Sequence, residues 1–168
     1  MTFAHPHRQF IRSMAYLAVA LGLTLLSGCS MKNLFGPAGT ARLEWKGLLV
    51  SANSNANQNT AVALDIVFVG DPEMLEKLSA LPASRWFAVR DDQLKTYPTA
   101  LSVHSLELVP GQSRLLSAET LGSPRVAGVL LFANYQAPGE HRLRLPPVPD
   151  GGLVILGERS FTVTEHRL

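Results

Sequence analysis

The feature that most restricts the fold of this chain is a succession of short apolar or alternating segments, separated by turn residues, that begins near residue 40. The segment 42–50 places Leu43, Trp45 and Leu49 on one side and charged residues on the other. This period of two indicates a half-buried β-strand. Further segments with strand character cover residues 61–69, 101–109, 113–118, 125–135, 140–145, 153–156 and 160–166. About seven to eight short strands with frequent turns favour a β-sandwich, in a mainly β fold.

One stretch between these strands has a helical period instead. Asp71-Pro72-Glu73 has the composition of a helix start, with a capping acid, a proline in the first turn and a second acid near the positive end of the helix dipole. Apolar residues follow at helical spacing as far as Pro82, and Ser84 is suited to cap a second helix. We therefore expect a short two-helix insertion at about residues 71–97.

Two features of this region have more than one interpretation. We interpret Trp86 and Phe87 as anchors that hold the helical insertion on the sheet, and a ligand pocket built on them is the alternative. Asp65 lies within the apolar segment 61–69, where a carboxylate needs hydrogen bonds or a cation. A structural partner for Asp65 is favoured over a role as a catalytic acid.

A different pattern occupies the first thirty residues. An apolar run follows Arg8 and Arg12 and ends in Leu-Ser-Gly directly before Cys29, which is the single cysteine of the chain. A basic start, an apolar middle and small residues before the cut are typical of a secretory signal, and the cysteine is typical of a bacterial lipoprotein. We expect cleavage between Gly28 and Cys29, a covalent diacylglycerol and an N-acyl chain on Cys29, and no other cofactor.

The alternatives for this run are a retained transmembrane helix and an ordinary buried cysteine. The run from Met14 to Gly28 is shorter than the roughly 20 residues that a membrane span needs. Three long acyl chains would make an effectively permanent anchor, because each buried methylene contributes about 0.8 kcal/mol. Ser30 follows the cysteine where an aspartate often retains such proteins in the inner membrane. We therefore expect an outer-membrane lipoprotein that faces the periplasm.

The expected organisation has three parts, a signal peptide over residues 1–28, a lipidated tether over 29–40 and a β-sandwich domain over 41–168. The chain has 15 lysines and arginines and 13 acidic residues, and the signal contains two of the basic residues and no acid. The remaining part is formally neutral, so it has no basic field for nucleic acid. Acylation of Cys29 leaves no cysteine for a disulfide.

The segment 51–60 has no charged residue and no large apolar residue. Asparagine and serine bond to their own backbone and favour turns, so we expect a long loop between two strands. One interpretation is a solvated loop. The other is a partner-binding loop, because loops on a rigid scaffold often carry function. The residues assigned to partner binding are Asn53, Ser54, Asn55, Asn57, Gln58 and Asn59.

Residue patterns for chemistry are not evident in the sequence. His104, His141 and His166 follow the signal, and none of them lies at metal-ligand spacing from another. Nucleophile-elbow and phosphate-loop motifs are absent. We therefore expect no enzyme and no metal, although sequence alone does not show which distant residues meet in space.

Several of these features occur together in one known family. They are the Leu-Ser-Gly-Cys signal, a first strand, a polar loop, a second apolar strand, and Asp71-Pro72 at the start of an insertion that contains Trp86-Phe87. The segment Leu-Glu-Leu-Val-Pro-Gly-Gln-Ser follows at 106–113, and a long apolar strand follows at 128–133. In this order of elements the chain resembles TssJ, the outer-membrane lipoprotein family of the type VI secretion membrane complex.

The resemblance implies a transthyretin-like β-sandwich with an added helical segment and no catalytic activity. It also implies binding to the periplasmic carboxy-terminal part of TssM, within a complex that includes TssL, so that the complex is fixed to the outer membrane. The family's loop between the first two strands, which is associated with that contact, corresponds in position to 51–60. Many relatives have an arginine and a tyrosine where this chain has residues 65–68, which places it in a divergent branch.

Two other classes remain open from the sequence. A periplasm-facing lipoprotein could bind a small ligand in an apolar pocket between the helical insertion and the sheet, or stabilise another envelope assembly. A cell-wall enzyme would need a cleft with convergent polar groups.

Overall fold

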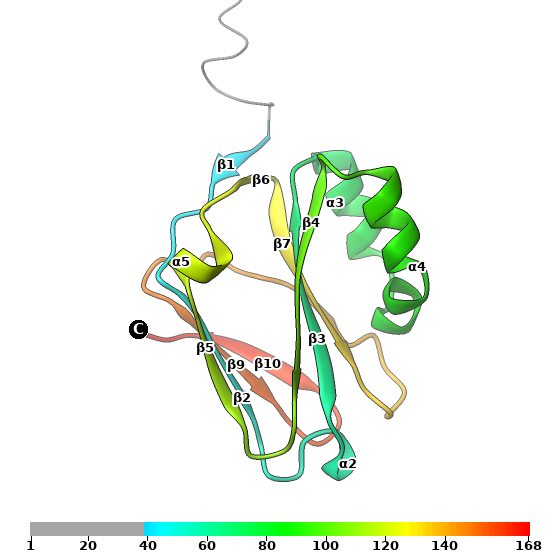
Figure 1. Ribbon diagram of the computed structural model, residues 1–168, viewed down its shortest axis with the longest axis vertical. Coiled ribbons are helices and arrows are strands. Elements are labelled where there is room, and N and C mark those ends of the chain that lie inside the picture. The colour runs from blue at the N-terminus through cyan, green and yellow to red at the C-terminus, as the bar shows by residue number, and fades with distance from the viewer. Residues whose placement is uncertain (1–38) are drawn as a thin grey trace, which may run out of the picture. The chain divides into compact units, whose positions relative to one another are not determined.

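The segments with strand character form a β-sandwich in the computed structural model, which describes residues 39–168 (Figure 1). The strands are β1 (Ala41–Arg42), β2 (Gly47–Ala52), β3 (Val62–Val69), β4 (Leu101–Leu108), β5 (Ser113–Ser117), β6 (Arg125–Val126), β7 (Gly128–Asn134), β8 (Arg142–Arg144), β9 (Gly152–Leu156) and β10 (Phe161–Glu165). One sheet has the order β4-β3-β7-β8 and the other β10-β9-β2-β5, while β1 pairs with β6. All pairs among these strands are antiparallel except that of β2 with β9.

The mainly β sandwich with a two-helix insertion is confirmed, but two predicted strands are each divided. The segment 42–50 forms β1 and β2, and the segment 125–135 forms β6 and β7. The second division lies at Ala127, whose backbone N–H donates to the carbonyl of Val69 instead of continuing one unbroken strand. These divisions raise the number of strands in residues 39–168 to ten.

The first division is explained by a glycine. Gly47 begins β2 with φ of +127°, a conformation that side chains of L-residues rarely adopt. A Cβ atom at this position would lie 2.2 Å from the backbone oxygen of Leu116 on β5. The chain therefore changes direction between β1 and β2, which the alternation of apolar residues does not reveal.

The helical insertion consists of α3 (Pro72–Ser79) and α4 (Ala83–Thr96), which lie together on one side of the sandwich (Figure 1). Asp71 caps α3 as predicted, since its Oδ1 accepts a 2.7 Å hydrogen bond from the backbone N–H of Met74. The predicted cap at Ser84 is wrong. Pro82 occupies the cap position of α4 in an extended conformation, and the backbone N–H of Ala83 donates to the carbonyl of Glu140 on another segment.

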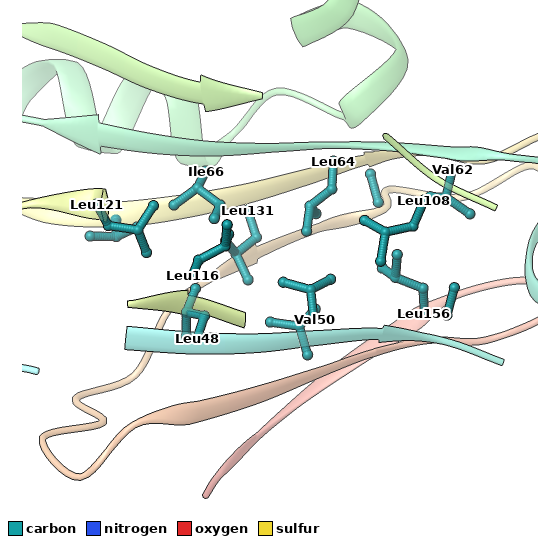
Figure 2. Packing of buried hydrophobic residues seen from close by; sticks show 14 of the residues in the cluster. Leu48, Val50, Val62, Leu64, Ile66, Leu108, Leu116, Leu121, Leu131 and Leu156 are labelled. Atoms are coloured by element: carbon teal, nitrogen blue, oxygen red, sulfur yellow. The ribbon is translucent and has the colours of Figure 1, made fainter. Parts of the chain in front are cut away.

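The apolar side chains form two clusters, one on each side of the β4-β3-β7-β8 sheet. The larger cluster fills the space between the sheets, where Leu64, Ile66 and Leu131 meet residues of β2 and β9 (Figure 2). The second cluster lies between the same sheet and the two helices and includes Trp86 and Phe132. One sheet is thus covered on both faces, as expected for the near-continuous apolar sequence of β3.

Within residues 39–168, no helix combines the length and the apolar composition that crossing a membrane requires.

Candidate interaction site at the β2–β3 connection

The predicted partner-binding loop is a tightly folded connection between β2 and β3. A turn at Ser54 and Asn55 leads into α2 (Ala56–Asn59), a single turn in which regular helical geometry is interrupted. The φ angles of Asn57, Gln58 and Asn59 are 45°, 56° and 64°, which lie in the left-handed region. Asparagine tolerates this region better than most residues, so the asparagine-rich composition fits the conformation. The predicted long loop between two strands therefore contains one irregular helical turn.

Asn57 is the residue that holds this connection in place. Its side chain is 3% exposed, its Oδ1 accepts a 2.8 Å hydrogen bond from the backbone N–H of Gln136, and its Nδ2 donates at 2.8 Å to the carbonyl of Ala61. Its backbone N–H donates at 3.1 Å to the carbonyl of Gly157. Its carbonyl accepts a 2.7 Å hydrogen bond from the hydroxyl of Thr60. Through its side chain and its backbone, Asn57 therefore links this connection to two segments that are distant in sequence, at Gln136 and Gly157.

This burial corrects the role predicted for Asn57. A side chain that is buried and hydrogen-bonded through both its oxygen and its nitrogen inside the domain is not available to a partner protein. The sequence could not identify Asn57 as the buried residue. The stretch 51–60 contains four asparagines, and no local feature distinguishes Asn57 from the other three.

The other predicted partner-binding residues lie on the surface. They are Asn53, Ser54, Asn55, Gln58 and Asn59. Asn55 Nδ2 donates to the carboxylate of Glu158 at 3.1 Å, and the carbonyl of Asn53 accepts from the backbone N–H of Gly111 at 3.2 Å. The connection is therefore joined to the β9–β10 and β4–β5 turns at one end of the sandwich, the end at which Figure 1 shows α2.

The chemistry of this end suits recognition of a protein surface. Amide and hydroxyl side chains supply both donors and acceptors without net charge. Because Asn57 fixes the backbone, these groups are held in a defined arrangement before any partner arrives, which lowers the entropy cost of binding. The set contains no pair of groups in the arrangement of a nucleophile with a base.

Asp65 has the hydrogen bonds that its position requires. It is 1% exposed and accepts from Trp86 Nε1 at 2.8 Å, from Ser105 Oγ at 2.6 Å and from Arg90 Nη1 at 3.3 Å. Burial by itself lowers the pKa of Arg90, but its contacts with Asp91 and Asp65 outweigh burial and leave that pKa raised. The preference for a structural partner agrees with these contacts.

Trp86 holds the insertion on the sheet as predicted. Its ring is fully buried and stacks on Phe132 of β7 with 5.0 Å between ring centroids. Phe87 is only partly buried at the edge of the same cluster, with the Arg90 guanidinium 5.7 Å from its ring centroid. The packing of Trp86 against Phe132 favours the anchor interpretation over the alternative of a ligand pocket built on Trp86 and Phe87.

His141 lies against Tyr135 with 4.8 Å between ring centroids, and its Nε2 is 2.6 Å from the carbonyl oxygen of Ala137. Burial raises the pKa of Tyr135, and a hydrogen bond with the Gly157 backbone acts in the opposite direction. The resulting pKa is about 12.

Residues 39–168 contain no group of three histidine, cysteine, aspartate or glutamate side chains placed to hold a metal ion.

The surface also has a hollow of about 490 Å³ beside β1. Its apolar lining includes Leu43, Trp45, Val129 and prolines of the segment 146–149. This position differs from the one predicted for a ligand pocket, which was between the helical insertion and the sheet.

Gly28 and Cys29 lie outside the described residues, so the predicted cleavage between them and the predicted acylation of Cys29 stay predictions.

Comparison with known proteins supports the fold. No family model matches this chain, and no curated protein matches it. Among solved structures, it is similar to the type VI secretion lipoprotein TssJ1 from Pseudomonas aeruginosa, with a TM-score of 0.51 and 17% sequence identity over 72% of this chain and 95% of that chain. The chain therefore has the TssJ fold, as the resemblance in sequence implied.

Two further solved structures are similar at TM-scores below 0.5. One is Lip from Serratia marcescens, a membrane-bound component of the type VI secretion system, at 0.46 and 15% identity over 71% of this chain and 96% of that chain. The other is the C-terminal domain of the type VI secretion protein TssM from EAEC, at 0.47 and 13% identity over 71% of this chain and 96% of that chain. We draw no conclusion from these two.

Proposed function

We propose that this chain is a TssJ-type lipoprotein that fixes a type VI secretion membrane complex to the outer membrane. The observation that carries the proposal is the fold shared with TssJ1 from Pseudomonas aeruginosa. In the sequence, this fold follows an apolar run that ends at the single cysteine. Acylation of Cys29 by a diacylglycerol and an N-acyl chain supplies the anchor, and the domain supplies a rigid protein surface in the periplasm.

The proposed partner is the periplasmic part of TssM, within a complex that includes TssL. Figure 1 places β1, where the described chain begins, at one end of the sandwich and α2 at the other. A domain attached to a membrane through residues before β1 presents the α2 end away from its attachment point. The exposed side chains Asn53, Ser54, Asn55, Gln58 and Asn59 form the proposed contact. The proposal includes no catalytic step.

A co-purification experiment tests the partner. The tagged full-length protein is recovered from detergent-solubilised membranes, and TssM is measured in the eluate. Ser54→Trp places a large side chain on the exposed turn, so we expect at least tenfold less TssM. The matched control is Glu119→Trp on α5 (Ala118–Leu121), an exposed position outside the α2 connection. TssM recovery that is equal for both variants contradicts the assigned surface, and no recovery with the unmodified protein contradicts the partner.

The anchor is tested separately by Cys29→Ser. This variant lacks the thiol that accepts the diacylglycerol, so we expect the domain to leave the outer-membrane fraction and secretion to be lost. Membrane fractionation by density gradient measures the first effect. If the variant still floats with outer membranes, another part of the chain anchors it.

A second candidate function is binding of a small apolar ligand in the hollow beside β1. The observation that favours it is the wall of Leu43, Trp45 and Val129 around about 490 Å³. Trp45 is a built-in fluorescent reporter for an occupant, so titration with apolar compounds and measurement of its emission tests this function.

A further inference from the structure

Strand β4 has a free edge, because it is an outermost strand of its sheet and pairs only with β3. In an antiparallel pair of strands, hydrogen-bonded residue pairs alternate with pairs that are not hydrogen-bonded. The backbone N–H of Gly70 donates at 2.8 Å to the carbonyl of Ala100, directly beyond the pair of Val69 with Leu101. The even-numbered residues of β4 therefore bond to β3, and the odd-numbered residues direct their backbone N–H and C=O groups outward.

The backbone groups that stay open at this edge belong to Val103, Ser105 and Glu107. The N–H of Leu101 donates at 3.0 Å to the carbonyl of Tyr97, in the turn before the strand. Within residues 39–168, no backbone group bonds to the outward N–H and C=O groups of the other three residues. Their spacing is that of a β-ladder, which an extended peptide segment matches.

The other outermost strands of the two sheets offer shorter edges. Natural proteins commonly protect edge strands by making them short or by placing proline or lysine in them. β8 has three residues, and the proline-rich segment 146–149 follows it. β5 and β10 have five residues each, and β5 turns directly into α5. β4 has eight residues with no proline and no lysine, so its free edge is the longest of the four.

A hollow of about 490 Å³, which we call the β4 hollow, adjoins this edge. Its lining includes residues 120–124, Phe68 of β3, and Ser102, Val103 and His104 of β4. Leu106 and Leu108 pack in the cluster between the sheets, so His104, on the same face of the strand, also points toward the space between the sheets. The β4 hollow can therefore receive a side chain from a strand that is added beside β4.

We propose that β4 accepts an extended segment of a partner protein as an additional antiparallel strand. In this mode of recognition, main-chain hydrogen bonds supply affinity, and pockets for alternate side chains supply specificity. The open ladder of Val103, Ser105 and Glu107 provides the hydrogen bonds, and the β4 hollow provides the pocket. The antiparallel direction continues that of every pair in this sheet. The proposal does not depend on TssM or on acylation of Cys29.

The register of an antiparallel strand defines the side chains that the partner segment needs. The position opposite Glu107 favours a basic side chain, because opposite charges across a ladder are stabilising. The positions three and five residues further along lie opposite His104 and Ser102, which border the β4 hollow, so they favour apolar side chains. The recognised segment therefore has a basic residue followed by two apolar residues at these spacings.

Binding of a synthetic peptide to the full-length, detergent-solubilised protein tests the proposal. The probe is Lys-Thr-Thr-Val-Thr-Val with an acetylated and an amidated end, which has the required pattern. Amide hydrogen exchange is measured by NMR. We expect the probe to slow exchange at least fivefold at Val103, Ser105 and Glu107, and to leave unchanged the amides of His104 and Leu106, which already bond to β3.

A control peptide, Lys-Thr-Val-Thr-Val-Thr, has the same composition but turns its valines to the face opposite the β4 hollow. We expect it to need at least a fivefold higher concentration for the same protection. This comparison separates recognition by the hollow from backbone pairing alone.

A substitution in β4 gives a second measurement. Glu107→Pro removes an N–H that points away from β3, and proline is tolerated at such edge positions, so the pairing of β4 with β3 is retained. We expect at least tenfold weaker binding of the probe. Glu107→Gln is the matched control, because it removes the charge and keeps the N–H, and it should weaken binding no more than threefold. If Glu107→Pro does not fold, a probe methylated on the backbone nitrogen opposite Ser105 replaces it.

Three results overturn the proposal. The first is slow exchange at Val103, Ser105 and Glu107 without peptide that increases with protein concentration, which assigns the edge to a second copy of the chain. The second is no protection at millimolar concentrations of the probe. The third is equal protection by the probe and the control peptide, which excludes the β4 hollow as the source of specificity.

Discussion

The indole nitrogen of Trp86 donates a 2.8 Å hydrogen bond to the carboxylate of Asp65, which joins the helical insertion to the centre of the β4-β3-β7-β8 sheet. Both residues are buried, with exposed fractions of 0% and 1%. The Trp86 ring also stacks on Phe132, so one side chain makes the polar and the apolar attachment of the insertion. Ser105 and Arg90 complete the shell around the carboxylate.

Trp86→Phe removes the donor to Asp65 and keeps an aromatic ring beside Phe132. We expect a decrease of about 1–3 kcal/mol in the free energy of unfolding, because the buried carboxylate loses a hydrogen bond. Denaturant titration of the detergent-solubilised protein measures it. Asp91→Ala is the control, because the carboxylate of Asp91 is 74% exposed in its ion pair with Arg90 and is expected to contribute less than about 1 kcal/mol. Equal effects of the two substitutions contradict the assigned role of Trp86.

Asn57→Ala tests the buried amide of the β2–β3 connection. The substitution leaves the N–H of Gln136 and the carbonyl of Ala61 without their partners, so we expect a loss of about 1–3 kcal/mol in stability. Hydrogen exchange should be faster at the Gln136 amide in particular. Asn55→Ala is the matched control, because Asn55 is exposed and its side chain donates to the exposed carboxylate of Glu158. Unchanged exchange at Gln136 in Asn57→Ala is the contrary result.

Gly47→Ala tests the bend between β1 and β2. We expect this change to weaken the pairing of β2 with β5 severely, because the added Cβ would lie 2.2 Å from the backbone oxygen of Leu116. Gly111→Ala is the control, since Gly111 also has a positive φ of +82° but has no atom within 4 Å of the added Cβ. Its cost is limited to the backbone conformation, about 1 kcal/mol. Thermal unfolding compares the two, and similar melting temperatures for both variants contradict the steric explanation.

The raised pKa of Tyr135 leads us to expect a loss of folding stability at high pH. Burial raises the pKa of Tyr135 to about 12 from an ordinary value of 10.0, so the folded state holds the neutral phenol, whose hydroxyl donates at 2.9 Å to the carbonyl of Ser160. This contribution is complete below about pH 10 and is lost as the pH rises toward 12. Tyr135→Phe removes it, so its free energy of unfolding should fall less steeply over that interval. Parallel slopes for the two proteins between pH 10 and 12 oppose this assignment.

The sequence predicted the layers of the fold, but it did not predict where strands bend or which residues pair across neighbouring strands. The alternation in 42–50 placed Leu43, Trp45 and Leu49 on one side. Trp45 is buried as predicted, but beyond the bend at Gly47 the core residues are Leu48 and Val50, so the placement of Leu49 on the inner side is wrong. A bend of this kind depends on how closely β5 approaches, which is a contact between residues far apart in sequence. The cap at Ser84 failed for the same reason, since Ala83 is held by Glu140 from the β7–β8 connection.

The candidate site shows the same limit. The uncharged composition of 51–60 predicted a connection with turns at the surface, and five of the six residues assigned to it are exposed. Which asparagine turns inward depends on the positions of Gln136 and Gly157, which the local sequence does not specify.

The sequence by itself determined the strand and helix periods, the position of the insertion and the single cysteine behind an apolar run, because these are properties of neighbouring residues. Only the tertiary structure decided which buried polar groups are paired and which side chains of the β10-β9-β2-β5 sheet point into the core. Asp65 meets Trp86 and Ser105, and Leu49 meets Leu115 and Leu153, through strand pairing across long sequence separations. Hydrogen bonding and the hydrophobic effect both depend on such distances in space, so the surfaces available to partners follow from the packed fold.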